Sequence, residues 1–214
     1  MTENPRLAIF DRWAVRYDQS VRTDDGIFAA YDDVLDALVE VAPLKPALRV
    51  LELGVGTGNL ARRLVARGCD VWGTDFSPAM LAIARDKVPE ATLLQMDLTA
   101  EWPAALRPRF DRVVAAFVLH EFPLPAKVEL LQRLFAESLT DEGFVVIGDI
   151  AFATADARRQ SGAESWDEDE YYWAADETAA ACAGAGLDVT FRPISWCTGI
   201  FVVTEMLTAA GIEG

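Results

Sequence analysis

Residues 50–58 read Val-Leu-Glu-Leu-Gly-Val-Gly-Thr-Gly, an apolar run that passes directly into three glycines at alternate positions. The run extends back to residue 47, and such a continuous apolar stretch is typical of a parallel strand covered on both faces. Gly54, Gly56 and Gly58 lack Cβ atoms, so they permit positive φ angles and close approach of a nucleotide-like ligand. We therefore expect a strand over residues 47–53, a ligand-binding loop, and a helix over residues 59–67.

The rest of the chain continues this alternation of strands and helices. Its patterns predict further strands at 70–74, 92–96, 111–118 and 144–150, and further helices at 5–18, 27–42, 77–87 and 123–138. A turn is expected at 141–143, before the fifth strand. Residues 187–195 and 199–206 read as two strands close enough to form an antiparallel hairpin. The fold class predicted is α/β: a Rossmann-like, doubly wound, mainly parallel seven-stranded sheet with an antiparallel C-terminal hairpin.

Composition limits the kind of partner. The chain has 214 residues, 52% of them hydrophobic, which suits one sizeable domain. Its 34 acidic and 19 basic residues give a net charge of −15, which disfavours nucleic acid, whose phosphates require Lys and Arg. No apolar run is long enough for a membrane span, no secretory signal is visible, and the three cysteines lack metal-binding spacing. We expect a cytoplasmic monomer or homodimer that acts on a small molecule.

Polar residues follow the second and third strands, at the sheet edge where folds of this kind bind ligands. The carboxylate of Asp75 can accept hydrogen bonds from both hydroxyls of a ribose, or can cap the helix that follows it. Phe76 can pack on an adenine face or on the sheet edge. Asp97 can accept from the exocyclic amine of adenine, with the Leu98 N–H reading a ring nitrogen, or can be an ordinary turn residue.

At this point the chain resembles the class I S-adenosylmethionine-dependent methyltransferases. Residues 50–58, 73–78, 95–98 and 110–117 look like the first four motifs of that class. Within it the chain is similar to the YrrT-like bacterial methyltransferases, on residues 13–21, 56–60, 77–80 and 170–172. The resemblance implies a strand order of 3-2-1-4-5-7-6, S-adenosylmethionine (SAM) as cofactor and S-adenosylhomocysteine (SAH) as product. It also implies an N-terminal helical lid (1–45), a cofactor-binding core (46–150) and an acceptor-side segment with the hairpin (151–214).

The resemblance also implies roles for particular residues. Gly54, Gly56 and Gly58 would hold the methionine and ribose portion of SAM. The remaining cofactor-binding candidates are Asp75 and Phe76, Met96, Asp97 and Leu98 around the adenine, and Phe117 at the end of the fourth motif. Tyr17 matches a lid tyrosine that closes over the methionine end, although it lies in an aromatic-bearing amphipathic helix where plain packing is an equal alternative.

The candidate catalytic residues are His120 and Tyr17. His120, the only histidine, follows the fourth strand and could accept a proton from the acceptor as a neutral imidazole. The alternative is a structural or cofactor-adjacent histidine. Glu121 and Asp149, at the ends of neighbouring strands, could form a base or a weak metal pair. Because no clear third ligand is visible, we expect no metal.

Residues 164–177 carry seven acidic side chains interleaved with Trp166, Tyr171, Tyr172 and Trp173. One interpretation is a solvated helix face whose aromatic side packs on the core. The other is a wall of the acceptor site, because carboxylates and aromatic faces suit a cationic or amine-bearing molecule. No Asn/Asp-Pro-Pro-Tyr/Phe stretch follows the fourth strand, which argues against methylation of nucleobase amines.

The sequence therefore predicts methyl transfer to a small-molecule acceptor by in-line attack on the sulfonium methyl. The protein would mainly align and desolvate the reactants. One alternative is an NAD(P)-dependent oxidoreductase, because residues 56–61 fit the pattern Gly-x-Gly-x-x-Ala and Asp75 could serve that cofactor too. Another is a non-catalytic binding protein that keeps a cofactor fold.

Overall fold

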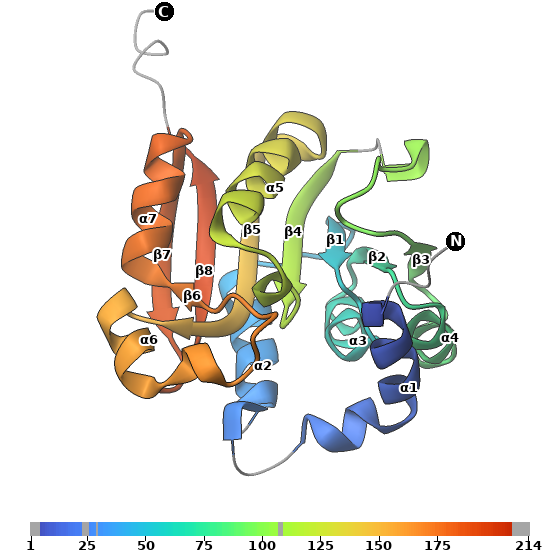
Figure 1. Ribbon diagram of the computed structural model, residues 1–214. Helices are drawn as coiled ribbons and strands as arrows, with labels where there is room; N and C mark the ends of the chain where they lie inside the picture. The colour runs from blue at the N-terminus through green and yellow to red at the C-terminus, as the bar shows by residue number, and fades with distance from the viewer. Residues whose placement is uncertain (1–4, 23–25, 29, 107–108, 207–214) are drawn as a thin grey trace, which may run out of the picture.

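A computed structural model describes residues 5–22, 26–28, 30–106 and 109–206, and it is built on one twisted sheet (Figure 1). The strands along the sheet follow the order β3-β2-β1-β4-β5-β8-β7, with the short β6 paired to β5. Their bounds are β1 Arg49–Leu53, β2 Asp70–Asp75, β3 Thr92–Gln95, β4 Phe110–Ala116, β5 Leu139–Phe152, β6 Trp173–Ala174, β7 Leu187–Pro193 and β8 Thr198–Glu205. The pairs are parallel except β5–β8 and β8–β7, which are antiparallel. The predicted fold is confirmed; β6 only shifts the numbers of the hairpin strands.

Helices cover both faces of the sheet. They are α1 Pro5–Ser20, α2 Tyr31–Val41, α3 Asn59–Ala66, α4 Pro78–Lys87, α5 Leu124–Glu137, α6 Ala155–Ser161 and α7 Ala175–Gly184, with 3-10 turns η1 Gly26–Phe28, η2 Ala104–Leu106, η3 Leu119–Glu121 and η4 Ala163–Ser165. Side chains alternate between the faces, so Val50 and Val114 pack under α2 and α3, whereas Leu51 and Val113 pack under α5 and α7. The two buried faces together hold the core.

Two local predictions were wrong, and one of the two interpretations of residues 164–177 does not hold. The second helix begins at Tyr31 rather than residue 27, because a 3-10 turn starts at Gly26 with φ +75°. No separate turn precedes the fifth strand: β5 already begins at Leu139, and a bulge takes up the extra residues before the pairing of Arg112 with Phe144. Residues 164–177 form no single helix. They comprise the end of η4, a connecting segment, β6 and the first turn of α7.

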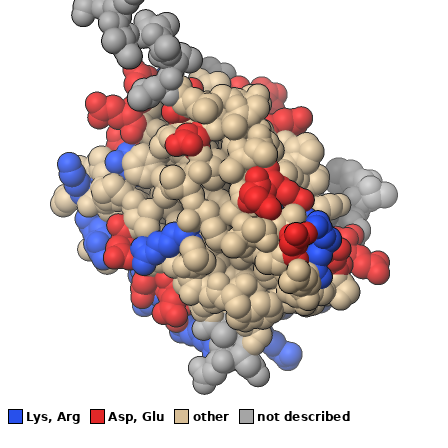
Figure 2. Space-filling model, turned by 90° about the vertical axis from the view of Figure 1, so that its left-hand side faces the viewer, with Lys and Arg blue, Asp and Glu red and all other residues tan. Residues whose placement is uncertain are grey.

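Two features bear on the kind of ligand. None of the described helices combines the length and the apolar character needed to cross a membrane. Figure 2 views the molecule from the side of α6 and α7, where acidic groups are scattered and the described Lys and Arg side chains lie singly or in small groups. This face therefore lacks the broad positive surface that nucleic acids require.

Candidate functional site

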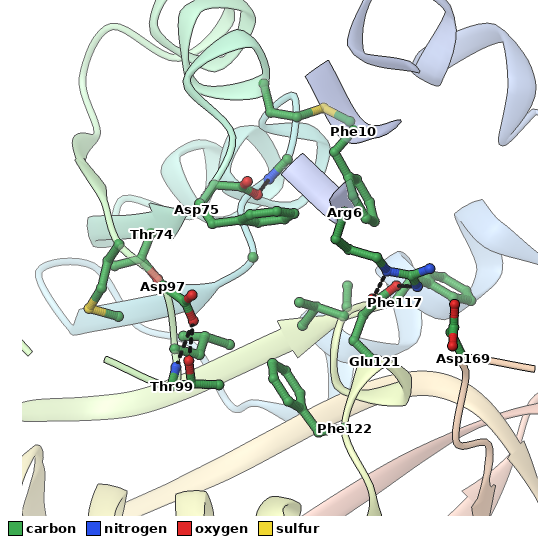
Figure 3. Close-up of a pocket in the computed structure, with 18 of the residues that line it drawn as sticks. Arg6, Phe10, Thr74, Asp75, Asp97, Thr99, Phe117, Glu121, Phe122 and Asp169 are labelled. Atoms are coloured by element: carbon green, nitrogen blue, oxygen red, sulfur yellow. Dashed lines mark hydrogen bonds and ion pairs between the residues drawn. The ribbon is translucent and has the colours of Figure 1, made fainter. Parts of the chain in front are cut away.

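A cavity of about 510 Å³ lies at the carboxyl ends of β1, β2 and β4, beneath α1 (Figure 3). Ligand pockets usually measure about 300–1,000 Å³. The predicted site residues that line it are Tyr17, Gly54, Gly56, Asp75, Phe76, Met96, Asp97, Leu98 and Phe117. Gly58 and His120 are not among its described lining residues. Residues far apart in the sequence thus meet at one edge of the sheet.

The glycine loop is shaped by positive φ angles. Gly54 has φ +67°, and a Cβ there would lie 2.5 Å from the Cγ2 atom of Val118. Gly56 has φ +52° with open space beside it, so its backbone conformation and not crowding favours glycine. Gly58, with φ +84°, is the N-cap of α3 and faces α4 instead of the cavity. The loop therefore leaves the Gly56 side open to a ligand.

Asp75 is locked to this loop. One oxygen of its carboxylate accepts from the Gly56 N–H at 2.8 Å and the other from the Ser77 N–H at 2.9 Å. The cap of α4 is Ser77, whose hydroxyl accepts from the Met80 N–H at 3.1 Å, so helix capping does not account for Asp75. Burial raises the pKa of Asp75, although the backbone N–H groups oppose this. The carboxylate is held rigidly in the cavity wall.

The ends of β2 and β3 form an apolar slot between Phe76, Met96 and Leu98. Phe76 contacts Phe10 of α1 edge to face, with ring centroids 5.2 Å apart. Asp97 accepts from the Thr99 N–H at 2.9 Å and from the Thr99 hydroxyl at 2.7 Å, both on the same oxygen. Asp97 therefore shapes the turn with one oxygen, while its second oxygen has no hydrogen bond to the described part of the chain, so its predicted contact with adenine stays a prediction.

Glu52 precedes the glycine loop, and its carboxylate is buried in an unusual environment. It is 2% exposed, and Oε2 lacks a hydrogen-bond partner among the described residues. Burial raises its pKa well above the usual value, and the Asp75 carboxylate adds to this. A buried acceptor without a partner is costly. Because Glu52 is not among the described residues that line the cavity, it lies behind the loop and does not face the ligand directly.

The opposite end of the cavity carries charged groups that the sequence did not bring together. Arg6 of α1 donates two hydrogen bonds to the Glu121 carboxylate (Figure 3). Its guanidinium also lies 3.7 Å from the Glu170 carboxylate. Asp169 and Tyr171 line the same end. Arg6 was not predicted, because it carries no local motif. Glu170 was named within residues 164–177, for which a wall of the acceptor site was one interpretation, and its contact with Arg6 was not foreseen.

His120 lies behind this end of the cavity and is 6% exposed. Its Nδ1 atom is 2.6 Å from the buried Asp149 carboxylate, and its backbone N–H donates to the other Asp149 oxygen at 3.1 Å. Nε2 lies 3.8 Å from Glu121 and 3.7 Å from Glu170. Burial alone would lower the pKa of His120, but Asp149, Glu170 and Glu121 together raise it. Asp149 thus holds the histidine and does not form the possible base or metal pair with Glu121.

α1 covers the cavity and is anchored by polar side chains along its length. Tyr17 is partly buried, and desolvation raises its pKa well above the usual value and keeps it a neutral phenol. It packs against Trp13, with ring centroids 4.8 Å apart, so packing and cavity lining coincide. The anchoring pairs are Arg6 with Glu121, Asp11 with Ser77 at 2.5 Å, Asp18 with Thr57 at 2.6 Å, and Asp18 with Lys87 at 2.7 Å.

Lys127 holds the segment around Tyr171 at one end of the cavity. Its burial predicts that folding stability depends on pH. It is 1% exposed, donates to the Tyr171 carbonyl at 2.5 Å and lies 4.0 Å from the Trp173 ring centroid. Burial lowers its pKa to about 7, although Asp149 opposes this. The unfolded chain therefore binds more protons than the folded one from about pH 7 to 10, so folding stability should rise with pH there.

Lys127→Met is expected to remove that rise. Urea denaturation at about pH 7 and pH 9 should show wild type gaining about 1–3 kcal/mol relative to the variant. Lys45→Met, at an exposed lysine, serves as the matched control and should follow wild type. Parallel pH profiles for wild type and Lys127→Met would contradict the effect of burial.

Comparison with known proteins places this site in a family. Residues 50–143 match the family model described as a methyltransferase domain. An uncharacterized methyltransferase of Oceanobacillus iheyensis is 36% identical over 180 residues, covering 78% of this chain and 81% of the relative. The uncharacterized methyltransferase YrrT of Halobacillus halophilus is 29% identical, over 87% of this chain and 91% of the relative. The solved DhpI-SAM-HEP complex is similar with a TM-score of 0.73 at 19% identity, over 93% of this chain and 95% of that one.

The fold and the matched domain define the class: this is a class I SAM-dependent methyltransferase, with SAM as cofactor and SAH as product. The chain belongs to the methyltransferase family of its Oceanobacillus iheyensis relative. The predicted class, activity and cofactor are confirmed, and the oxidoreductase alternative is not favoured.

Proposed function

We propose that this methyltransferase acts on a small, amine-bearing molecule held between the glycine loop and residues 169–171. SAM supplies an activated methyl group on a sulfonium, so the chain has to bind, align and exclude water. The observation that carries the proposal is the division of one cavity into two unlike ends. One end joins the glycine loop, Asp75 and an apolar slot, and the other joins carboxylates to aromatic rings.

The first end fits the parts of SAM. Asp75 would accept from the ribose hydroxyls, and the slot between Phe76, Met96 and Leu98 would hold the adenine. The open side of Gly56 would lie against the ribose and methionine portion. Glu52, buried behind the loop and without a hydrogen-bond partner on Oε2 among the described residues, would attract the positive charge of the α-amino group from there. Phe117 and Tyr17 would close the methionine end.

The second end suits a cation. Glu121 and Asp169 line it beside Phe122 and Tyr171, and Glu170 stands next to them. Arg6 is an example of a cation bound at this end, because its guanidinium contacts Glu121 and lies close to Glu170. An acceptor amine would take up this interaction once the Arg6 side chain has turned away. The aromatic rings would add cation–π attraction.

His120 acts through other residues in this proposal. Its Nδ1 is committed to Asp149, it does not line the cavity, and its raised pKa favours the charged form, which cannot accept a proton. It would position the carboxylates of Glu121 and Glu170. Glu121, at the cavity surface, is the better candidate to contact the acceptor and receive its proton.

A screen of metabolites for transfer of a radiolabelled methyl group tests the proposal. We expect amines to be the acceptors, and Glu121→Gln to raise the KM for the acceptor about tenfold or more while calorimetry shows SAM affinity within about threefold of wild type. Glu129→Gln, an exposed acid on α5, is the matched control. An acceptor without an amine, or an unchanged KM in Glu121→Gln, would contradict the amine assignment.

A further inference from the structure

Three ligand-type atoms converge beside the cavity, on residues from two distant parts of the chain. They belong to His120, Glu121 and Glu170, whose ligand atoms all lie within 4.8 Å of one another. His120 Nε2 is 3.8 Å from Glu121 Oε1 and 3.7 Å from Glu170 Oε1. These contacts are too long for hydrogen bonds, and the imidazole is more than nine-tenths buried.

His120 and Glu170 are each held by a hydrogen bond with a second residue. This leaves Nε2 of His120 and Oε1 of Glu170 facing the point where the three ligand atoms converge. Asp149 binds Nδ1 of His120 at 2.6 Å, so Nε2 is the nitrogen that faces the carboxylates. The Tyr172 hydroxyl donates to Glu170 Oε2 at 2.6 Å, so Oε1 faces His120. A carboxylate behind a histidine, and a hydrogen bond behind a ligating carboxylate, are the usual supports of protein metal ligands.

We propose that Nε2 of His120 and the Oε1 atoms of Glu121 and Glu170 form a binding site for a divalent first-row transition-metal ion such as Mn²⁺ or Zn²⁺. One imidazole and two carboxylates are ligands that these ions accept, and the Nε2 proton of His120 would be released to solvent as the ion binds. Metal–ligand bonds of about 2.0–2.2 Å require the ligand atoms to approach to roughly 3.5 Å. Small rotations of the two partly exposed carboxylates, whose side chains are 15% and 16% exposed, supply that change.

Arg6 is the competitor of the metal ion. Its terminal nitrogen contacts Glu121 Oε1 and lies 3.7 Å from Glu170 Oε1, the same two oxygens that would bind the ion. A guanidinium and a dication cannot both occupy this position, so metal binding requires the Arg6 side chain to move away. An amine acceptor would use Glu121 as well, so we expect it and the metal ion to exclude each other.

Calorimetric titration of the full chain with Mn²⁺ and with Zn²⁺ tests the site. The protein is treated with chelator, freed of any affinity tag, and measured without SAM or acceptor, so that the result does not depend on the proposed acceptor. We expect one ion per chain, and His120→Asn and Glu170→Gln to weaken binding at least about tenfold. Arg6→Gln should tighten binding at least about threefold, because the competing cation is gone.

Glu168→Gln, an exposed acid two residues from Glu170, is the matched control and should bind like wild type. Circular dichroism establishes that each variant folds. If His120→Asn does not fold, the metal affinities of Glu170→Gln and Arg6→Gln test the proposal. Both side chains are partly exposed, so we expect these two variants to fold. Unchanged affinity in Glu170→Gln, or weaker binding in Arg6→Gln, overturns the proposal. The metal-site proposal does not depend on the acceptor, so it would stand even if the acceptor proved not to be an amine.

Discussion

Asp75→Ala is expected to weaken SAM binding at least about tenfold, equivalent to about 1.4 kcal/mol. The proposed role of Asp75 is to accept from the ribose hydroxyls, and hydrogen bonds to a charged group contribute about 1.5–3 kcal/mol each. The carboxylate also fixes the Gly56 N–H, so the substitution would disturb the loop as well. Calorimetric titration with SAM and SAH measures the loss.

Two variants control this experiment. Asp70→Ala removes an exposed carboxylate at the other end of the same strand, where it pairs with Arg49 at 3.4 Å, and should bind SAM like wild type. Asp75→Asn keeps the shape of the side chain and should lose less affinity than alanine. Unchanged SAM affinity in folded Asp75→Ala would refute the ribose role.

Asp149→Ala is expected to lower the free energy of unfolding by about 3–5 kcal/mol, because removing one member of a buried charged pair leaves the other uncompensated. Asp149 is 0% exposed and accepts from the His120 backbone and from the Trp173 indole at 3.0 Å, besides its contact with the imidazole. Urea denaturation at neutral pH measures the change.

The exposed Asp188 of β7 provides the control, and Asp188→Ala should change stability by less than about 0.5 kcal/mol. Asp149→Asn retains a hydrogen-bond acceptor, so its loss of free energy of unfolding should lie between those of Asp188→Ala and Asp149→Ala. A loss below about 1 kcal/mol in Asp149→Ala would mean that the pair contributes little to folding. It would also weaken the assignment of Asp149 as the residue that positions His120.

The parts of the molecule that were predicted correctly depend on local patterns. The glycine loop, the alternation of strands and helices, and the terminal hairpin each have signatures within a few residues of one another. They placed Gly54, Asp75 and Asp97 at one sheet edge, because the carboxyl ends of parallel strands meet there. Cofactor and class followed from the same residues.

The charged end of the site depends on contacts that no local pattern encodes. Residues 166–172 look helical by their acidic and aromatic content, yet the Trp173 indole donates to Asp149 and Lys127 donates to the Tyr171 carbonyl. These long-range bonds hold the segment in a non-helical path and override its local preference. The third partner of His120 and Glu121 was missed for this reason, since Glu170 reaches them only through that path.

The anchoring of α1 has a kinetic consequence. Arg6, Asp11 and Asp18 tie α1 to three separate segments around the cavity, at Glu121, Ser77 and Thr57. We expect a ligand held beneath α1 to leave more slowly while these contacts persist, which would give it a residence time separate from the affinity set by Asp75 and the apolar slot. In an enzyme whose cofactor must be exchanged after every methyl transfer, the reciprocal of that residence time would be an upper limit on turnover.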